Sequence, residues 1–209
     1  MVSKKSPRQI KAEKTKKTIF GCAIRLFQQY GYHSVSVDDI VEASKTSVGT
    51  FYHYFKCKEE LIIMFLSTYT HKYYEDYELV NLVQEKDKPA MDRLYNFLLF
   101  SLDISDAGGE EFQRIAMAYL LRADSVQPAY DYMLSPERAF ARICKNLIAE
   151  GQEKGEIRRD RSVDELFSTV ALFSNGIDER WFMSRGAFNP RKEYGGVLWE
   201  FMRNMLTPR

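Results

Sequence analysis

The segment from Ser36 to Phe55 constrains the fold of this chain more than any other part. It reads SVDDIVEASKTSVGTFYHYF, and its spacing predicts two short helices joined by a tight turn. Small polar and aromatic side chains fill the second helix, where most soluble helices carry Lys and Glu. This build is typical of a helix-turn-helix, whose second helix enters the major groove of DNA.

The charge of the chain is unevenly distributed and fits that interpretation. The net charge of all 209 residues is +1, but residues 1–60 hold eleven Lys and Arg against six Asp and Glu, so they carry +5 and the remainder −4. A basic end on a mildly acidic body suits a domain that binds a polyanion. The lysines from Lys4 to Lys17 are expected to add non-specific affinity along the minor groove. The alternative is a solvated N-terminal tail.

Cysteine usage and hydropathy set further bounds on the class of protein. Cys22, Cys57 and Cys144 are widely spaced and form no CxxC pair, so the sequence indicates neither a zinc site nor a disulfide framework. No apolar run approaches the roughly 20 residues of a membrane span, and no apolar stretch follows the basic N-terminus as in a secretory signal. We therefore expect a soluble cytoplasmic protein with no membrane partner.

The sequence contains no pattern that predicts catalysis. His33, His53 and His71 lack the spacing of metal ligands, and neither a nucleophile–base pattern nor a phosphate-binding loop is present. We predict that the protein is not an enzyme and uses no metal or cofactor.

Helical spacing of apolar residues dominates the chain, and no alternating strand pattern is sustained. Gly31 is expected to end the first helix in a left-handed conformation. Ser36 with Asp39 is expected to cap the second helix, and Ser47 or Thr46 the third. Nine helices are expected. The first spans 7–30, the second begins at 37, the third spans 48–55, the fourth begins near 58 and the fifth begins at 87–89. After a loop at 106–109, the sixth runs to about 123, the seventh spans 135–136 to 155, the eighth begins after 162 and the ninth after 189.

Many positions of residues 15–61 fall in one register with a known pattern. They are Ile19, Ala23, Leu26, Phe27, Gly31, Tyr32, Val35, Ser36, Val37, Ile40, Ser47, Gly49, Thr50, Phe51, Tyr52, Tyr54, Phe55, Lys58, Glu59 and Leu61. Together they resemble the N-terminal domain of TetR-type transcriptional repressors. The resemblance implies an all-α fold of nine helices. It also implies a DNA-binding domain at 1–60, with its helix-turn-helix at 36–55, and a ligand-binding and dimerisation domain at 61–209.

The sequence departs from the family pattern at four positions. Ser44 stands where Ala is usual, Thr46 where Val is usual, and Cys57 where Asn or Asp usually caps the fourth helix. Lys45 occupies a turn position where Gly or Asn is usual, which predicts a strained φ costing about 1 kcal/mol. Cys57, between two lysines at a helix start, is also a candidate thiolate whose oxidation would perturb that helix; the alternative is an inert substitution.

The predicted DNA contacts follow from the second helix and its flanks. Gly49 would let the helix backbone approach DNA, unless it merely starts a helix. Thr50 and His53 would reach base edges. Tyr52 and Lys58 would bind phosphate. The alternatives are that Tyr52 is a half-buried core tyrosine and Lys58 a solvated lysine. The complete set is Ser36, Lys45, Thr46, Ser47, Val48, Gly49, Thr50, Tyr52, His53 and Lys58, in which Ser36 and Ser47 could act as caps only.

Two further sites are implied by the resemblance. A small inducer would bind between the fourth and eighth helices, and the aromatic and Met-rich side chains there favour an apolar or aromatic ligand with one or two polar handles; plain core is the alternative. The candidate lining is Tyr69, Tyr73, Tyr95, Phe100, Phe112, Met117, Tyr119 and Phe173, with Phe97, Tyr130 and Met133 nearby. The last two helices would pair across a homodimer through Phe167, Val170, Phe173, Ile177, Trp181, Leu198, Phe201, Met202 and Met205, unless these are internal core.

The functional prediction is therefore a repressor that a small ligand releases from a palindromic double-stranded operator. A DNA-binding protein without a ligand and a transcriptional activator remain as alternatives.

Overall fold

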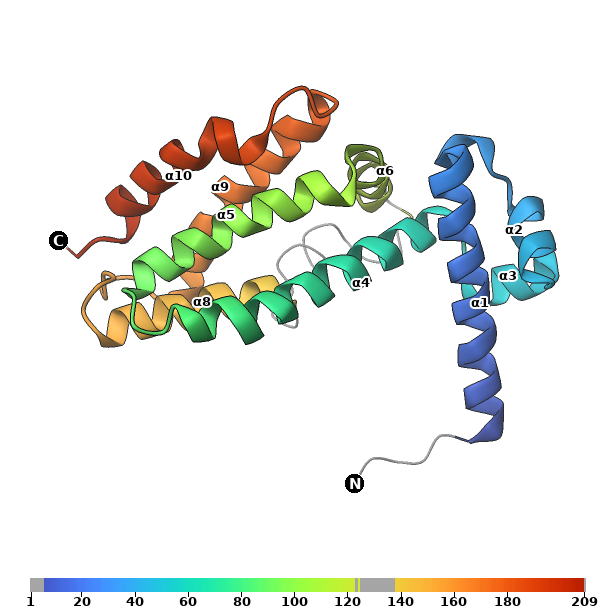
Figure 1. Ribbon diagram of the computed structural model, residues 1–209, viewed down its shortest axis with the longest axis horizontal. Helices are drawn as coiled ribbons and strands as arrows, with labels where there is room; N and C mark the ends of the chain where they lie inside the picture. The colour runs from blue at the N-terminus through green and yellow to red at the C-terminus, as the bar shows by residue number, and fades with distance from the viewer. Residues whose placement is uncertain (1–5, 123, 125–137, 209) are drawn as a thin grey trace. The chain divides into compact units, whose positions relative to one another are not determined.

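The computed structural model describes residues 6–122, 124 and 138–208, and within these ranges it contains nine α-helices and no strand (Figure 1). The chain divides into two compact units, Met1–Phe65 and Leu66–Arg209. The division falls inside one helix, α4 (Glu59–Tyr77). Within the described ranges, every helix is too short or too polar to cross a bilayer.

The first unit is built around a long helix and the two short helices of the motif. A capping box starts the long helix, since the Ser6 hydroxyl accepts from Gln9 N–H and the Gln9 side chain accepts from Ser6 N–H. Ile19 of the long helix and Ile40 and Phe51 of the two short helices are completely buried, and the first short helix packs against the other two helices. The elements are α1 (Pro7–Tyr30), a 3₁₀ turn (Tyr32–Ser34), α2 (Val37–Ser44) and α3 (Val48–Tyr54).

The second unit is organised around helix α5. Leu94, Phe97 and Leu98 are fully buried on it, and α5 packs against both α8 and α10 (Figure 1). Gly195 permits the close approach of α10, because a Cβ at that position would lie 3.2 Å from Leu99 Cδ2. The elements are η2 (Glu78–Leu82), α5 (Ala90–Gly108), α6 (Glu110–Leu120), α8 (Ala139–Glu153), α9 (Val163–Met183) and α10 (Pro190–Leu206).

Several local expectations are corrected by the structure. Gly31 has a positive φ of 82° but a ψ of 148°, which is not the left-handed helical conformation. The expected loop at 106–109 is wrong, because α5 continues to Gly108 and only Gly109, with φ 87°, separates it from α6. A π-helical turn at Glu78–Leu82 follows α4 and had no signal in the sequence. The expected helix boundaries at 123 and 135–136 lie outside the described residues.

Candidate functional site

Helix α3 presents two different faces. Phe51 is completely buried on one of them, and Val48, Gly49, Tyr52 and His53 are exposed on the other. Tyr52 keeps 54% of its surface exposed, so it is not a core tyrosine. The exposed positions recur four residues apart and therefore lie on the same side of the helix. The structure thus brings the central predicted DNA contacts together on one outward surface.

Gly49 has no packing partner that would require a glycine. A Cβ built at Gly49 would meet only one atom within 4 Å, the Ser47 Oγ at 3.9 Å, among the neighbours that the structure describes. Its backbone lies within a regular helix, so the conformation does not require glycine either. The missing side chain leaves space only on the outer surface of α3.

The turn between α2 and α3 is held by backbone and side-chain hydrogen bonds. Lys45 adopts the left-handed conformation with φ 53° and ψ 43°, which confirms the expected strain at this non-glycine residue. Thr46 N–H donates to the Val41 carbonyl at 2.9 Å. The hydroxyls of Ser44 and Thr46 are 2.8 Å apart and hydrogen-bonded. Two departures from the family pattern, Ser44 and Thr46, therefore bond to each other inside the turn.

The two serines that begin α2 and α3 act as helix caps. Ser36 Oγ accepts from Asp39 N–H at 3.1 Å, and Asp39 Oδ2 accepts from Ser36 N–H at 2.7 Å. Hydrogen bonds from Ser36 hold the pKa of the Asp39 carboxyl below its usual value. Ser47 Oγ accepts from Thr50 N–H at 3.1 Å and also hydrogen-bonds to the Thr50 hydroxyl at 2.8 Å. Both hydroxyls remain at the surface of the unit.

Lys58 has a different environment from the one expected of a phosphate ligand. Its ammonium donates to the Val35 carbonyl at 2.5 Å and to the Tyr32 carbonyl at 3.2 Å. It also lies 4.4 Å from the centroid of the Tyr32 ring. Burial lowers the pKa of the Lys58 ammonium, against the opposing charges of Glu59 and Asp39. We therefore revise its expected role: the side chain fastens the start of α4 to the segment before α2.

The family model for bacterial regulatory proteins of the tetR family matches residues 19–63, a segment that includes α2, α3 and the turn between them. The chain belongs to the TetR family. The predicted all-helical fold is likewise confirmed by its likeness to solved members of the family.

Two curated relatives of this TetR-family chain are also regulators of transcription. The chain is 25% identical over 178 residues to the HTH-type transcriptional repressor DhaR of Mycobacterium sp. (strain GP1), covering 84% of this chain and 86% of the relative. It is 38% identical over 73 residues to the HTH-type transcriptional regulator YuxN of Bacillus subtilis (strain 168), covering 35% of this chain and 24% of YuxN. The chain therefore spans only about a quarter of the length of YuxN.

A solved structure extends the likeness to the second unit. The TetR-family repressor FadR of Thermus thermophilus, crystallised with lauroyl-CoA, has a TM-score of 0.72 over 90% of this chain and 92% of its own. The sequence identity is 19%, so this match concerns the fold alone. With these relatives, the chain is a TetR-family transcriptional regulator, and the relatives named are regulators rather than enzymes.

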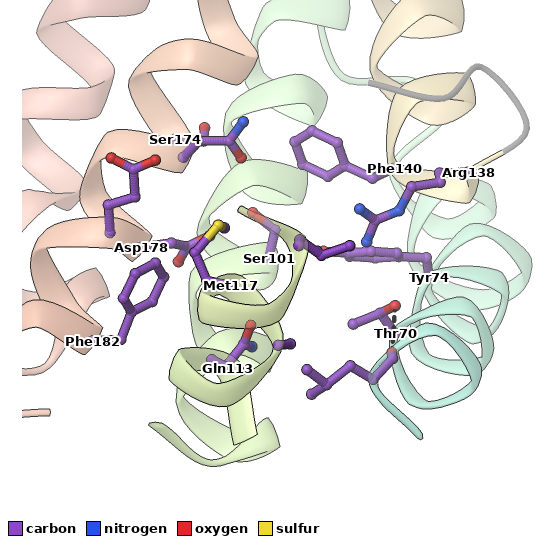
Figure 2. A pocket seen from close by; sticks show the side chains of 15 residues that line it. Thr70, Tyr74, Ser101, Gln113, Met117, Arg138, Phe140, Ser174, Asp178 and Phe182 are labelled. Atoms are coloured by element: carbon purple, nitrogen blue, oxygen red, sulfur yellow. Dashed lines mark hydrogen bonds between the residues drawn. The ribbon is translucent and has the colours of Figure 1, made fainter. Parts of the chain in front are cut away.

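The second unit of this regulator contains a cavity of about 100 Å³ (Figure 2). Helices α4, α5, α6 and α9 and the residues that begin α8 contribute to its walls. The side chains that line it are Leu66, Thr70, Tyr74, Ser101, Gln113, Ala116, Met117, Leu120, Arg138, Phe140, Ser174, Asn175, Asp178, Glu179 and Phe182. Met117 is the one residue of the predicted ligand-binding set among them.

Three other members of the predicted set lie on α4 and α5 but not in the cavity. Tyr73 is 40% exposed, so it does not line a buried cavity as predicted. Its ring contacts that of Tyr69. Burial, together with the hydrogen bond to Tyr73, raises the pKa of Tyr69 to about 12. Tyr95 packs on Trp199 and donates to the Gly195 carbonyl at 3.1 Å.

The remaining members of the set also lie outside the cavity lining. Phe100 packs on Tyr74 and Tyr77. Phe173 stacks on Phe201 of α10, with ring centroids 4.1 Å apart. Phe112 and Tyr119 belong to α6. Of the neighbouring candidates, Phe97 is buried core of α5, and Tyr130 and Met133 lie outside the described residues.

The predicted ligand-binding set contains none of the polar side chains that line the cavity, among them Thr70, Ser101, Ser174 and Asp178. Ser174, which is itself buried, and Asp178 lie four residues apart on α9, and the buried Ser101 interrupts the apolar stripe of α5. Polar residues on an otherwise apolar helical stripe were the available signal, since buried polar groups need partners.

The predicted dimer interface also needs correction. Most of its side chains are covered by their own chain, so they have no apolar surface left for a partner: Phe167, Val170, Ile177, Trp181, Leu198 and Met202. Phe173, Phe201 and Met205 are only partly buried. The outward faces of these helices carry other apolar residues, including Leu172 at 70% exposure and Val197 at 48%. Periodicity alone did not distinguish the inward stripe from the outward one.

Proposed function

We propose that this TetR-family regulator is a repressor that binds a palindromic DNA operator as a homodimer and leaves it when a small molecule fills the cavity of the second unit. The observation that carries the proposal is the outer face of α3, where Gly49 leaves an open backbone between exposed Val48, Tyr52 and His53. A helix with a small residue and polar-tipped aromatics on its outer face fits the major groove.

Each residue of that face has an assignable task in the proposed complex. His53 and Thr50 would contact base edges or thymine methyl groups. Tyr52 would donate its hydroxyl to a phosphate oxygen, and Gly49 would allow the helix backbone to approach the duplex. Lys45, exposed at the turn, would contribute a phosphate contact in place of Lys58.

A dimer is required because one helix-turn-helix reads about half of an operator. Two copies related by a two-fold axis would place their α3 helices about 34–36 Å apart, one turn of DNA. The exposed side of α9 and α10 is the surface we propose for this pairing. It combines Leu172, Gly176 and Val197 with the edges of the stacked Phe173 and Phe201 rings.

Ligand release would act through helix α4. Leu61 and Ile62, near its start, are fully buried, whereas Leu66, Thr70 and Tyr74 further along line the cavity. A ligand that favours one position of α4 would shift the population between dimers that fit the operator and dimers that do not.

Selection of bound duplexes from a random pool tests the proposal. The selected sequence should be a palindrome. At matched ionic strength, two chains should bind the full palindrome more tightly than one chain binds an isolated half-site. Light scattering of the protein alone should give a dimer. A monomer that selects no sequence contradicts the proposal, and a reporter gene activated through the selected operator contradicts the assignment as a repressor.

A further inference from the structure

The size of the cavity restricts the ligand to a compact molecule. Its volume is about 100 Å³, and an apolar protein cavity of roughly 150 Å³ accommodates benzene. A single six-membered ring therefore already reaches the limit of this volume, and substituents on the ring require the walls to move apart slightly. A long acyl chain such as the lauroyl group bound by Thermus thermophilus FadR does not fit this volume.

The walls of the cavity combine aromatic and polar surfaces. Tyr74, Phe140 and Phe182 supply ring faces or edges, and Met117 adds a flexible apolar side chain. Aromatic rings pack well against such walls in stacked or edge-on arrangements. The polar side chains, in contrast, concentrate on two sides. In Figure 2, Ser174, Asp178 and Phe182 lie on the α9 side, and Thr70, Tyr74 and Arg138 lie opposite.

Ser174 is the polar group whose environment points most directly to a ligand. It is only 3% exposed, and no residue that the structure describes forms a hydrogen bond with its Oγ. A buried hydroxyl without a partner is costly to the fold. Since Ser174 is one of the residues that line the cavity, a polar group of a bound molecule that reaches its hydroxyl would satisfy it.

The charges of the lining are also separated. Asp178 and Glu179 place carboxylates on the same α9 wall as Ser174, and Arg138 contributes a guanidinium from the start of α8. Acceptors on the α9 wall favour a donor group of the ligand and repel an anion. The guanidinium favours a carboxylate at the other end, where it can form charge-assisted hydrogen bonds.

We propose that the cavity binds a hydroxylated monocyclic aromatic acid. The ring lies between Tyr74, Phe140 and Phe182, the hydroxyl meets Ser174 and Asp178, and the carboxylate meets Arg138. This inference rests on the proposed function, because it names the ligand that would release the operator. Ligands with several negative charges, such as CoA thioesters, are disfavoured by both the volume and the two carboxylates.

Calorimetry on the full chain tests the proposal with a matched set of probes. 4-Hydroxybenzoate should bind once per chain. Benzoate, which lacks the hydroxyl donor, should bind roughly fivefold to tenfold more weakly, and phenol, which lacks the carboxylate, roughly tenfold to a hundredfold more weakly. Lauroyl-CoA should not bind. Equal affinity for 4-hydroxybenzoate, benzoate and phenol overturns the proposal, as does binding of lauroyl-CoA alone or of none of the four.

Substitutions connect those differences to the named residues. Ser174→Ala should weaken 4-hydroxybenzoate roughly fivefold to tenfold while leaving benzoate unchanged. Arg138→Gln should weaken 4-hydroxybenzoate toward the affinity of phenol. Ser168→Ala, on the same helix but outside the cavity lining, is the control and should change neither. If Ser174→Ala and Ser168→Ala behave alike, Ser174 is not a ligand contact and the proposal fails.

The same probes separate this inference from the proposed function. Calorimetry needs no DNA, so ring binding is measured whether or not an operator exists. If none of the aromatic probes binds and the protein stays on the operator in the presence of each of the four probes, the inference is overturned and DNA recognition stands. If the protein binds 4-hydroxybenzoate but selects no operator, the proposed function is overturned and the ligand class stands.

Discussion

The two units of this regulator keep their candidate functional residues in opposite environments. In the first unit, Gly49, Tyr52 and His53 lie on the exposed face of a single short helix. In the second unit, the cavity is assembled from α4, α5, α6, α8 and α9, and its most informative polar side chain, Ser174, is buried. The candidate surface site is thus local in sequence, whereas the candidate cavity site draws its residues from Leu66 to Phe182.

This difference separates folding from function in the first unit. Phe51 and Tyr52 are neighbours in the sequence, but Phe51 is 0% exposed and Tyr52 faces outward. One residue therefore serves the core, and the next is available to a partner. In the second unit, buried side chains of the cavity wall would have to serve both the packing of the core and the contact with a ligand.

The largest expected effect tests that separation directly. Phe51→Ala removes a fully buried ring and should lower the free energy of unfolding by about 3–5 kcal/mol, with loss of DNA binding as a consequence. Tyr52→Ala should change the free energy of unfolding by no more than about 0.5 kcal/mol while still weakening DNA binding. Urea denaturation with fluorescence anisotropy on the selected operator measures both. Comparable destabilisation by the two substitutions would remove the distinction.

The next effect concerns two lysines of the first unit. Lys58→Met removes hydrogen bonds to the Tyr32 and Val35 carbonyls and should lower the free energy of unfolding by roughly 1–2 kcal/mol, since the group is partly solvated. It should leave the slope of log K against log salt unchanged. Lys45→Ala, at the exposed turn, should instead flatten that slope by roughly one. A flattened slope for Lys58→Met would restore the original assignment of Lys58 to a phosphate.

Gly49 offers a test in which stability and binding move in opposite directions. Gly49→Ala should raise the free energy of unfolding by up to about 1 kcal/mol, because alanine is the better helix former and its Cβ meets only Ser47 Oγ at 3.9 Å. It should nevertheless weaken operator binding by about tenfold, through crowding against the duplex. Gly21→Ala, on α1, is the matched control for stability alone, since its built Cβ meets no packing neighbour within 4 Å among the described residues. Unchanged operator affinity in Gly49→Ala would indicate that α3 does not approach DNA closely at this residue.

Much of the first unit could be predicted because its determinants are local. The capping box of Ser36 and Asp39, the N-cap at Ser47 and the left-handed conformation at Lys45 all depend on residues within a few positions of one another. Helix α1 likewise begins and ends at the expected residues, Pro7–Tyr30. Local hydrogen bonds and backbone preferences are what a sequence specifies most directly.

The cavity could not be predicted in the same way, because it depends on which faces of distant helices meet. An apolar stripe predicts burial but not the neighbour, so Tyr95 was expected in a pocket and instead packs on Trp199. The inward and outward faces of α9 were confused for the same reason, as Trp181 is buried and Leu172 exposed. Only the tertiary arrangement places Ser174 and Arg138 in one cavity.

Two buried serines provide the smallest expected effect and the sharpest form of the comparison. Ser44 of the first unit hydrogen-bonds to the Thr46 hydroxyl at 2.8 Å and lies 3.4 Å from the Val41 carbonyl, so Ser44→Ala should lower the free energy of unfolding by about 1 kcal/mol. Ser174 has no such partner among the described residues, so Ser174→Ala should leave that free energy unchanged or raise it by up to about 1 kcal/mol. Denaturant unfolding without ligand measures the pair. A loss in Ser174→Ala as large as that in Ser44→Ala would mean that its hydroxyl supports the fold, and the case for keeping it for a ligand would be lost.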